Sequence, residues 1–269
     1  MLFSILIAHY NNYTYFRDCY ESILKQTHQN FEIILVDDAS TDGSFEKIKD
    51  YTLADSRVKC FKNETNKGVG FTKRKAAELA SGEICGFIDP DDAITPNAIE
   101  SAIQQYKNEK TVAVYSTLAM CDQQLNFKKN FAPSKQVKNG DAKFFNIFLE
   151  VNHFFTFRKS AYQKTDGINP NITSAVDQDL YLKIYDTGNV KYIPEANYLY
   201  RMHDKGVSQE KSKKGKLNEN WNIVISDTLK RRNVTKLYGK NVAEISNLSK
   251  FIYEKQNSTF EKLKRKFGF

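Results

Sequence analysis

Residues 84–92 read Ile-Cys-Gly-Phe-Ile-Asp-Pro-Asp-Asp, an apolar run that leads directly into an acidic loop. A short apolar run bounded by turn-forming residues is typical of a buried strand. The four residues that end it, Asp89-Pro90-Asp91-Asp92, form either a proline-containing acidic turn or a metal site. Their position after a strand and before a helix favours the metal site.

Three similar apolar runs precede this one, and helix-like segments separate them. The predicted strands are residues 3–8, 31–36, 58–61 and 84–88, and the predicted helices lie near 12–26, 43–53 and 69–80. This alternation predicts an α/β fold with a Rossmann-like, mostly parallel central sheet and helices on both of its faces. Ligands of such sheets bind beyond the carboxyl ends of the strands.

Polar loops follow three of the predicted strands, at residues 9–12, 37–43 and 89–92. Each loop alone is compatible with ordinary turn formation, and Ser40 or Thr41 could cap the next helix. Parallel strands, however, place their carboxyl ends at one edge of the sheet. The convergence of three polar loops at that edge therefore predicts a binding site.

The second half of the chain is expected to contain fewer strands and a different C-terminal part. The predicted elements are a helix at 96–107, a strand at 111–121, a helix followed by a strand within 144–157, a helix at 175–185, a loop at 205–216 and two helices near 217–232 and 240–265. The chain is thus expected to have a main domain at 1–204, with halves 1–110 and 111–204, and a helical extension at 205–269.

The composition is that of a folded protein without a membrane span. Of the 269 residues, 41% are hydrophobic and 27% are charged. No apolar run approaches the roughly 20 residues of a membrane-spanning helix, and the run at 2–8 lacks the basic leader of a signal peptide. The four cysteines form no C-x-x-C pair, which predicts free thiols in a reducing cytoplasm.

The net charge of +8 belongs to the C-terminal part of the chain. Residues 1–200 contain 23 Lys and Arg against 25 Asp and Glu, whereas residues 201–269 contain 17 against 7. The main domain therefore lacks the basic face of a nucleic-acid-binding protein, and no nucleic-acid partner is expected.

Several side chains carry groups suited to phosphate and metal chemistry. Asp91 and Asp92 could present carboxylate oxygens to Mg²⁺ or Mn²⁺, ions that also accept phosphate oxygens. His203 could complete the metal shell or be a packing residue. Arg201 could contact a phosphate or lie on the surface.

Two carboxylates at positions i and i+2 begin the helix predicted at 175–185, so they point in different directions and have separate roles. Asp177 is either a general base or a capping carboxylate at the helix N-terminus. Asp179 could orient a neighbouring side chain or cap the turn.

A nucleotide would need a flat surface, an acceptor and cationic groups. Tyr10 could stack on a base and Asp38 could accept from a ring N–H, although Tyr10 could equally be core and Asp38 a turn residue. Residues 66–70, Asn-Lys-Gly-Val-Gly, and the run Lys73-Arg74-Lys75 could meet a diphosphate or form a solvated helix face.

Taken together, residues 2–208 resemble the inverting glycosyltransferase family 2, a family with the GT-A fold that includes enzymes of bacterial cell-surface polysaccharides. The motifs that carry the resemblance lie at residues 4–11, 36–44, 66–70, 80–83, 89–92, 177–180 and 200–203. The chain departs from the family at Ala8-His9, at Val176 and at Lys73-Arg74, where the family has Pro and a small polar residue, Glu, and Arg-Asn. The last departure leaves open whether Lys73 or Arg74 contacts the diphosphate.

The resemblance implies roles for individual residues. Asp177 would be the catalytic base, and Asp91, helped by Asp92 or Asp89, would bind Mn²⁺ or Mg²⁺ together with His203. Of the two helpers, Asp92 is expected to be the ligand and Asp89 to organise the loop. The nucleotide sugar would be bound within residues 1–110, the acceptor within 111–204. The residues implied to bind the nucleotide sugar are Ala8, His9, Tyr10, Asn11, Asp38, Asn66, Lys67, Gly68, Lys73, Arg74, Asp89, Asp91 and Arg201.

The implied reaction is a single in-line displacement with inversion. A sugar moves from a nucleotide-diphosphate donor, with uridine as the implied base, to a hydroxyl of a saccharide or lipid-linked saccharide. The alternative is a non-catalytic nucleotide- or glycan-binding relative, which the presence of Asp91, Asp177 and His203 argues against. A nucleotide-binding oxidoreductase would need a G-x-G-x-x-G loop after the first strand, where this chain has His-Tyr-Asn-Asn.

The C-terminal extension combines an apolar stripe with many basic residues. Its apolar members recur at three- and four-residue steps and are Ile245, Leu248, Ile252, Phe260, Leu263 and Phe267. The stripe packs on the catalytic domain or on a second subunit of a homodimer, or else residues 240–269 lie on an anionic membrane. The expected location is the cytoplasm, at the inner face of the plasma membrane in the last case.

Overall fold

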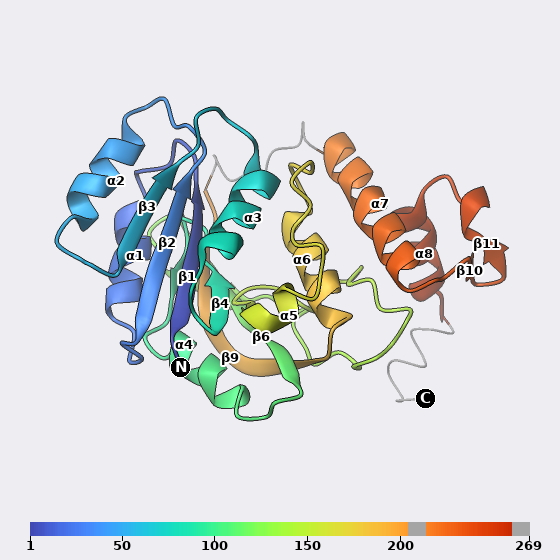
Figure 1. The fold of residues 1–269 in the computed structure, drawn as a ribbon. Coiled ribbons are helices and arrows are strands. Elements are labelled where there is room, and N and C mark those ends of the chain that lie inside the picture. The colour runs from blue at the N-terminus through green and yellow to red at the C-terminus, as the bar shows by residue number, and fades with distance from the viewer. Residues whose placement is uncertain (204–213, 260–269) are drawn as a thin grey trace.

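A computed structural model describes residues 1–203 and 214–259 of the chain. Its core is a nine-stranded sheet with the strand order β3-β2-β1-β4-β8-β6-β9-β5, in which β7 pairs with β6 (Figure 1). The strands of its N-terminal half are β1 (Phe3–His9), β2 (Phe31–Asp37), β3 (Val58–Lys62) and β4 (Ile84–Phe87). These four are parallel, which confirms the predicted strands and their arrangement.

Alternation along the strands divides the core between the two faces of the sheet. In β1, Phe3, Ile5 and Ile7 contribute to one apolar cluster, while Leu6 contributes to the other. The first cluster also takes in the helices α1 (Phe16–Leu24), α2 (Ser44–Thr52) and α4 (Ala98–Gln105). The second takes in α3 (Val69–Leu79) and α6 (Val176–Tyr185). Helices therefore cover both faces, as the α/β prediction requires.

The other half of the sheet is mixed. It contains β5 (Ala93–Ile94), β6 (Thr111–Cys121), β7 (Phe127–Asn130), β8 (Thr156–Arg158) and β9 (Asn189–Arg201), with the short helix α5 (Lys159–Tyr162) after β8. β6 pairs in parallel with β9, but the pairs β4–β8, β6–β8, β6–β7 and β5–β9 are antiparallel. The parallel arrangement thus holds for the half that carries the three polar loops, and the second half departs from it.

The helix predicted within 144–157 is wrong, since only β8 is regular there. Asn146 and Leu149 adopt positive φ angles of 50° and 57°, which an α-helix excludes. The Asn146 side chain also forms both hydrogen bonds of the Val151 backbone: it donates to the carbonyl at 2.7 Å and accepts from the N–H at 2.9 Å. This segment is therefore a loop that is stabilised by the side chain of Asn146.

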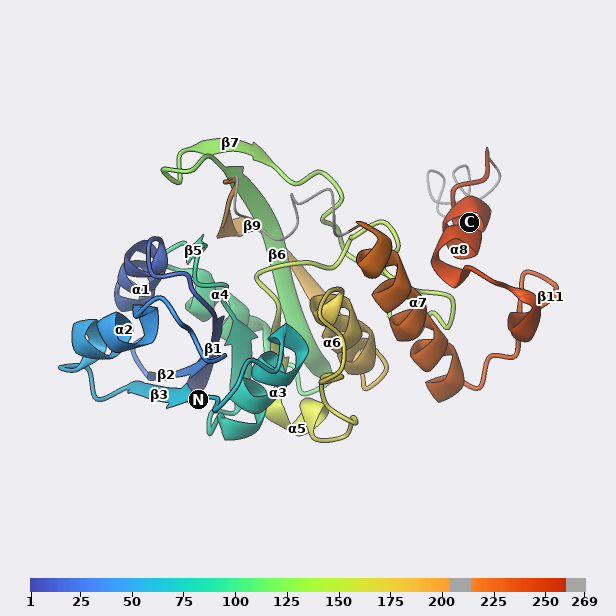
Figure 2. The ribbon, with the colours of Figure 1, turned by 90° about the horizontal axis from the view of Figure 1, so that it is seen from above.

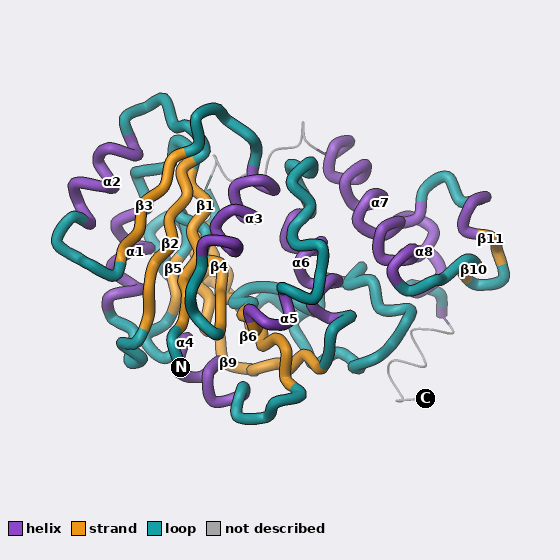
Figure 3. The backbone as a smooth tube through the Cα atoms, in the orientation of Figure 1, coloured by secondary structure: helices purple, strands orange, loops and turns teal. Residues whose placement is uncertain are grey.

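The C-terminal extension contains α7 (Lys214–Arg231), the hairpin strands β10 (Lys236–Leu237) and β11 (Lys240–Asn241), the 3₁₀ turn η3 (Val242–Glu244) and α8 (Leu248–Gln256) (Figure 3). The first predicted helix is confirmed. The second, at 240–265, is wrong in extent, because Asn247 caps a new helix by accepting from the Lys250 N–H at 2.9 Å. Ile245 consequently lies outside the helix. The loop prediction at 205–216 lies outside the described residues up to 213, and residues 214–216 belong to α7.

The described part of the extension packs on the main domain. Figure 2 shows α7 beside α6 and α8 on the outer side of α7. Ile225, Leu248 and Ile252 form an apolar cluster with Phe145 of the main domain. Leu248 and Ile252 of the predicted stripe are therefore covered within this chain, and Phe260, Leu263 and Phe267 lie outside the described residues. No helix within 1–203 and 214–259 is both long and apolar enough to cross a membrane.

Candidate active site

The polar loops after β1 and β2 are joined by a buried histidine and aspartate. His9 Nδ1 lies 2.8 Å from Asp37 Oδ2, and His9 Nε2 accepts from the Asn12 N–H at 3.2 Å. Because Nε2 accepts, Nδ1 is the ring nitrogen that donates to Asp37. Burial opposes ionisation of Asp37, but hydrogen bonds from His9 and Ser40 outweigh it and lower the pKa of Asp37. The resemblance implied that His9 contacts the nucleotide sugar. In the structure His9 is only 1% exposed and holds the two loops together.

Asp38 organises the glycine loop that precedes α3. Its Oδ1 accepts from the Lys67 N–H at 2.9 Å and its Oδ2 from the Gly68 N–H at 2.8 Å. Asn63 Nδ2 adds a bond to Oδ1 at 2.9 Å. The structure therefore brings Asp38 and residues 66–68 together as predicted, although most of the carboxylate's bonding capacity is used within the chain.

The other implied residues of the first loop lie nearer the surface. Tyr10 is 47% exposed, which suits a stacking surface and excludes the core alternative. Asn11 has a φ of 49° and accepts from the Thr41 N–H through its side chain at 2.9 Å. Ala8 is half-buried at the end of β1. This loop and the loop after β2 thus form one edge of the site.

A buried lysine joins two carboxylates that are far apart in sequence. Lys73 Nζ lies 2.8 Å from Asp177 Oδ1 and 3.1 Å from Asp89 Oδ1. The Lys73 side chain is 4% exposed, whereas both carboxylates retain 32%. Burial disfavours the charged lysine, but Asp177 and Asp89 outweigh it and raise the pKa of Lys73 above its usual value. The cluster connects the loop after β4 with the start of α6.

Asp177 keeps one oxygen open. Burial opposes its ionisation, but Lys73 and then His153 outweigh it and lower the pKa of Asp177. Lys73 occupies Oδ1, while the neighbour of Oδ2 is His153 Nε2 at 3.9 Å, beyond hydrogen-bond range. A partly exposed, ionised carboxylate whose Oδ2 has no side-chain hydrogen bond within residues 1–203 and 214–259 is suited to act as a base.

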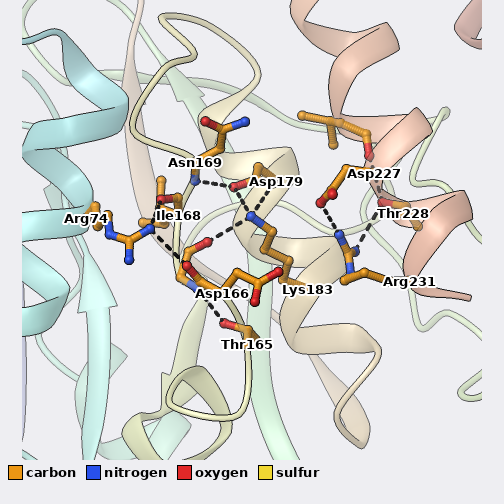
Figure 4. A network of polar contacts seen from close by, with 12 residues as sticks. Arg74, Thr165, Asp166, Ile168, Asn169, Asp179, Lys183, Asp227, Thr228 and Arg231 are labelled. Carbon is orange, nitrogen blue, oxygen red and sulfur yellow. Dashed lines mark hydrogen bonds and ion pairs between the residues drawn. The ribbon is translucent and has the colours of Figure 1, made fainter.

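Arg74 faces away from this cluster and supports the loop before α6. Its guanidinium donates to the carbonyls of Asp166 at 2.9 Å and Ile168 at 3.2 Å (Figure 4). On the other side of the loop, Asp179 accepts from the Asn169 N–H at 2.7 Å and pairs with Lys183 at 2.9 Å. The sequence had left open whether Lys73 or Arg74 contacts the diphosphate. Lys73 is the one that lies in the site, and the position of Arg74 does not support its implied contact with the nucleotide sugar. The predicted orienting role of Asp179 is confirmed.

The loop after β4 contains a buried anchor, Asp92. Asp92 Oδ2 accepts from the Tyr198 hydroxyl and Oδ1 from the Arg201 N–H, both at 2.8 Å. Burial, reinforced by Asp91 and Asp89, raises the pKa of Asp92 well above its usual value. A 2%-exposed carboxylate with both oxygens occupied is poorly placed to bind metal. Asp92 therefore has the organising role expected of Asp89, and Asp89 faces the site.

The implied phosphate contact of Arg201 is likewise not supported. Its Nε donates to the Asp91 carbonyl at 2.6 Å, and its NH2 pairs with Asp18 at 2.8 Å. The guanidinium also lies 4.5 Å from the centre of the Tyr15 ring, and the side chain is 2% exposed. Arg201 thus fastens the loop after β4 to α1.

Asp91 and His203 form the pair that could hold a metal ion. His203 Nε2 lies 2.9 Å from Asp91 Oδ2, and the Asp91 side chain retains 24% exposure. Among residues 1–203 and 214–259, no group of three His, Cys, Asp or Glu side chains is close enough to hold a metal ion by itself. The pair offers one oxygen and one nitrogen donor, so phosphate oxygens and water would have to complete a shell.

Two surface hollows lie away from this site. One is between α1 and α2, has a volume of about 570 Å³ and is lined by Tyr51 among others; the other is between α6 and α7, has a volume of about 860 Å³ and is lined by Arg231 among others.

Three site residues were missed by the sequence analysis. His153 and Tyr181 flank Asp177, and Tyr198 joins Asp92 to the ring of His153, with ring centres 4.7 Å apart. Tyr181 could have been found, because position i+4 lies on the same helix face as Asp177. His153 and Tyr198 lie in segments whose sequence carries no comparable signal.

The parallel half-sheet, with its acidic loop after β4, has the arrangement that the resemblance to the GT-A class implies. The model of the family "Glycosyl transferase family 2" matches residues 4–166, and the chain belongs to this family. Two relatives are the chondroitin synthase of Escherichia coli, 30% identical, and the hyaluronan synthase of Pasteurella multocida, 28% identical. Each comparison covers 94% of this chain but only 36% and 26%, respectively, of the relative.

Solved structures share the fold. S. aureus TarS 1–349 in complex with UDP-GlcNAc has a TM-score of 0.70 at 20% identity, covering 85% of this chain and 67% of that one. The mannosyltransferase PcManGT from Pyrobaculum calidifontis has a TM-score of 0.61 at 13% identity, covering 94% and 68%. These similarities confirm the GT-A fold that the sequence motifs imply.

Proposed function

We propose that this chain is a metal-dependent, inverting glycosyltransferase that moves a sugar from a nucleotide-diphosphate donor, with uridine as the favoured base, to a saccharide hydroxyl. The observation that carries the proposal is the cluster of Asp177, Lys73 and Asp89. It supports the proposal because Asp177, a carboxylate suited to act as a base, lies close to Asp89 in the loop that would meet the donor.

The donor would lie over the carboxyl ends of β1, β2 and β4. Tyr10 would stack on the base, and the Asp38-supported residues 66–68 would form the wall beside it. Asp91 and His203 would hold Mn²⁺ or Mg²⁺, with Asp89 as the nearby third carboxylate. Such an ion, when bound, stabilises the negative charge of the departing diphosphate. Lys73 contributes a buried positive charge to the same side of the site.

Asp177 would accept the proton of the acceptor hydroxyl at Oδ2. The acceptor oxygen then forms its bond to the anomeric carbon as the bond from that carbon to the diphosphate oxygen breaks, so the configuration inverts. Lys73 on Oδ1 keeps the carboxylate ionised and oriented in the resting state. The 166–169 loop, held by Arg74 and Asp179, fixes the start of α6 and with it the position of Asp177.

The relatives support this assignment at the level of substrate class. Two of the relatives are named as synthases of chondroitin and hyaluronan, and TarS was solved with UDP-GlcNAc. PcManGT was solved with GDP-Man and Mn²⁺. These similarities support a saccharide or lipid-linked saccharide as the acceptor, in the synthesis of a surface polysaccharide. Residues 240–269 would bring the enzyme to an anionic membrane through their basic side chains.

The test compares Asp177→Asn with the exposed control Asp166→Asn. Turnover of a panel of UDP-sugars is followed by UDP release with Mn²⁺, and UDP affinity is measured by calorimetry. We expect Asp177→Asn to lose about 100-fold or more in turnover and to bind UDP normally, whereas Asp166→Asn matches the wild type. Near-normal turnover in Asp177→Asn would refute the assignment. Wild-type binding of UDP without any turnover would instead favour a non-catalytic binding protein.

A further inference from the structure

The open oxygen of Asp177 faces a histidine at a distance that leaves room for one atom. Asp177 Oδ2 and His153 Nε2 are 3.9 Å apart, too far for a hydrogen bond between them. An oxygen about 2.8 Å from both would see them at an angle of roughly 90°. This arrangement suits a hydroxyl that donates to the carboxylate and accepts from the imidazole.

Two buried polar atoms in the residues around Asp177 lack a hydrogen-bond partner in the described part of the chain. They are His153 Nδ1, on the other side of the ring from Nε2, and the hydroxyl oxygen of Tyr181. Buried polar atoms are nearly always satisfied, so the unpaired hydroxyl of Tyr181, whose ring lies edge-on to that of His153, indicates a polar ligand or ordered water. Burial, with Asp177 and Asp89, raises the pKa of Tyr181 well above its usual value, so the hydroxyl remains a donor.

His153 is held rigidly in this position. Its ring stacks on Tyr198, with the planes inclined by 21°, and the following N–H of Phe154 donates to Ser116 Oγ at 3.1 Å. The loop that carries it is joined to α6 by the bond from Asn146 Nδ2 to Gln178 Oε1 at 2.7 Å, one residue from Asp177. The loop and the base therefore have a fixed relation to each other.

We propose that His153 and Tyr181 form, together with Asp177 Oδ2, the subsite that holds the reacting hydroxyl of the acceptor. His153 donates from Nε2 to the oxygen of that hydroxyl while the hydroxyl proton points at Asp177. Tyr181, four residues after Asp177 on the same face of α6, supplies a second neutral donor next to the forming bond. The ligand is a molecule with a neutral O–H group, either a sugar alcohol group or water. This inference rests on the proposed function, because it assumes that Asp177 is the base.

The kinetic test uses water as the acceptor. Variants His153→Phe, which retains a ring to stack on Tyr198, and His153→Gln, which retains a polar end, are compared with Asp177→Asn and with the control His28→Phe. Hydrolysis of UDP-sugars is measured with Mn²⁺, together with UDP affinity and melting temperature. We expect His153→Phe to lose about 10- to 100-fold in hydrolysis with unchanged UDP affinity, and His153→Gln to recover most of that loss. Tyr181→Phe should lose less than His153→Phe.

The outcomes separate this inference from the proposed function. If Asp177→Asn is inactive but His153→Phe matches the wild type, the subsite is wrong and the base assignment stands. If Asp177→Asn is active, or the wild type hydrolyses no UDP-sugar, the proposed function itself fails. Parallel losses of melting temperature, UDP affinity and hydrolysis in both His153 variants would show a merely structural role. A crystal structure with UDP should show a water bonded to both Asp177 Oδ2 and His153 Nε2, and direct contact between these atoms would overturn the subsite.

Discussion

The ammonium group of Lys73 in α3 lies 2.8 Å from the carboxylate of Asp177 in α6, 104 residues further along the chain. The bond joins the helix behind the glycine loop to the helix that carries the proposed base. The loop before α6 also approaches α3 closely at Gly70, where a Cβ would lie only 2.4 Å from the carbonyl oxygen of Ile172. The two elements on either side of the candidate site, α3 and the segment that begins α6, are thus connected directly.

Lys73→Met should destabilise the fold, because it leaves Asp89 and Asp177 facing each other without their shared cation. Loss of one partner from a buried ion pair is costly, and since these carboxylates are partly exposed we expect a loss of about 2 kcal/mol in the free energy of unfolding. Urea denaturation measures it. Lys75→Met is the matched control, since Lys75 Nζ bonds only to Asn63 Oδ1, at 2.9 Å, among the described contacts. Equal losses in both variants would contradict the special position of Lys73.

Glu32 makes stability depend on pH at the opposite end of the sheet. Burial alone would raise its pKa, but Lys59, Ser4 and Ser81 donate to the carboxylate and lower the pKa from 4.5 to about 2. A lowered pKa in the folded state adds stability above pH 4.5, and that stability is lost as the pH falls through about 2.

Glu32→Gln should therefore lower the free energy of unfolding by up to about 3 kcal/mol at neutral pH. The difference in free energy of unfolding between the variant and the wild type should decrease below pH 4.5 and vanish near pH 2. Urea titrations at a series of pH values measure this. Glu64→Gln, on an exposed loop, serves as the control and should show no gap. A gap for Glu32→Gln that does not change with pH would show that the charge of Glu32 is not its cause.

Asp91 and Asp92 should respond differently to loss of charge. Asp91→Asn removes the partly exposed carboxylate that we propose as a metal ligand, so Mn²⁺ affinity in the presence of UDP should fall by about 10- to 100-fold with little change in melting temperature. Asp92→Asn disturbs the buried bonds to Tyr198 and Arg201, so the melting temperature should fall more than in Asp91→Asn. Calorimetric Mn²⁺ titration and thermal melts on both variants give the comparison. The reverse pattern would restore Asp92 as the metal ligand.

The basic residues near the C-terminus should govern membrane contact. Replacing Lys262, Lys264, Arg265 and Lys266 by Gln should weaken sedimentation with phosphatidylglycerol vesicles, by about 1 kcal/mol for each charge that lies near the surface. Vesicles of neutral phosphatidylcholine are the control and should bind neither protein. Unchanged sedimentation with the anionic vesicles would assign the basic residues another role.

Some markers of the family resemblance follow from packing. In the stretch Ala80-Ser81-Gly82-Glu83, Ser81 donates to Glu32, and the Gly82 N–H donates to Ser4 Oγ at 2.8 Å. A Cβ on Gly82 would lie 2.6 Å from that same Ser4 oxygen. This motif therefore fastens the amino ends of β1, β2 and β4 to one another, at the edge away from the site.

The sequence by itself was sufficient for the parallel half of the sheet and its three polar loops, because strand periodicity and strand-end loops are local properties. It also singled out Asp177 as the proposed base. Distant partners decided the rest. Lys73 rather than Arg74 lies beside Asp177, Asp92 is buried with both oxygens hydrogen-bonded, and the Arg201 guanidinium is paired with Asp18. His153 reaches Asp177 from a loop for which the local pattern had predicted a helix. Which of two neighbouring charged side chains is buried depends on groups that can lie more than a hundred residues away along the chain, and these groups meet only in the folded structure.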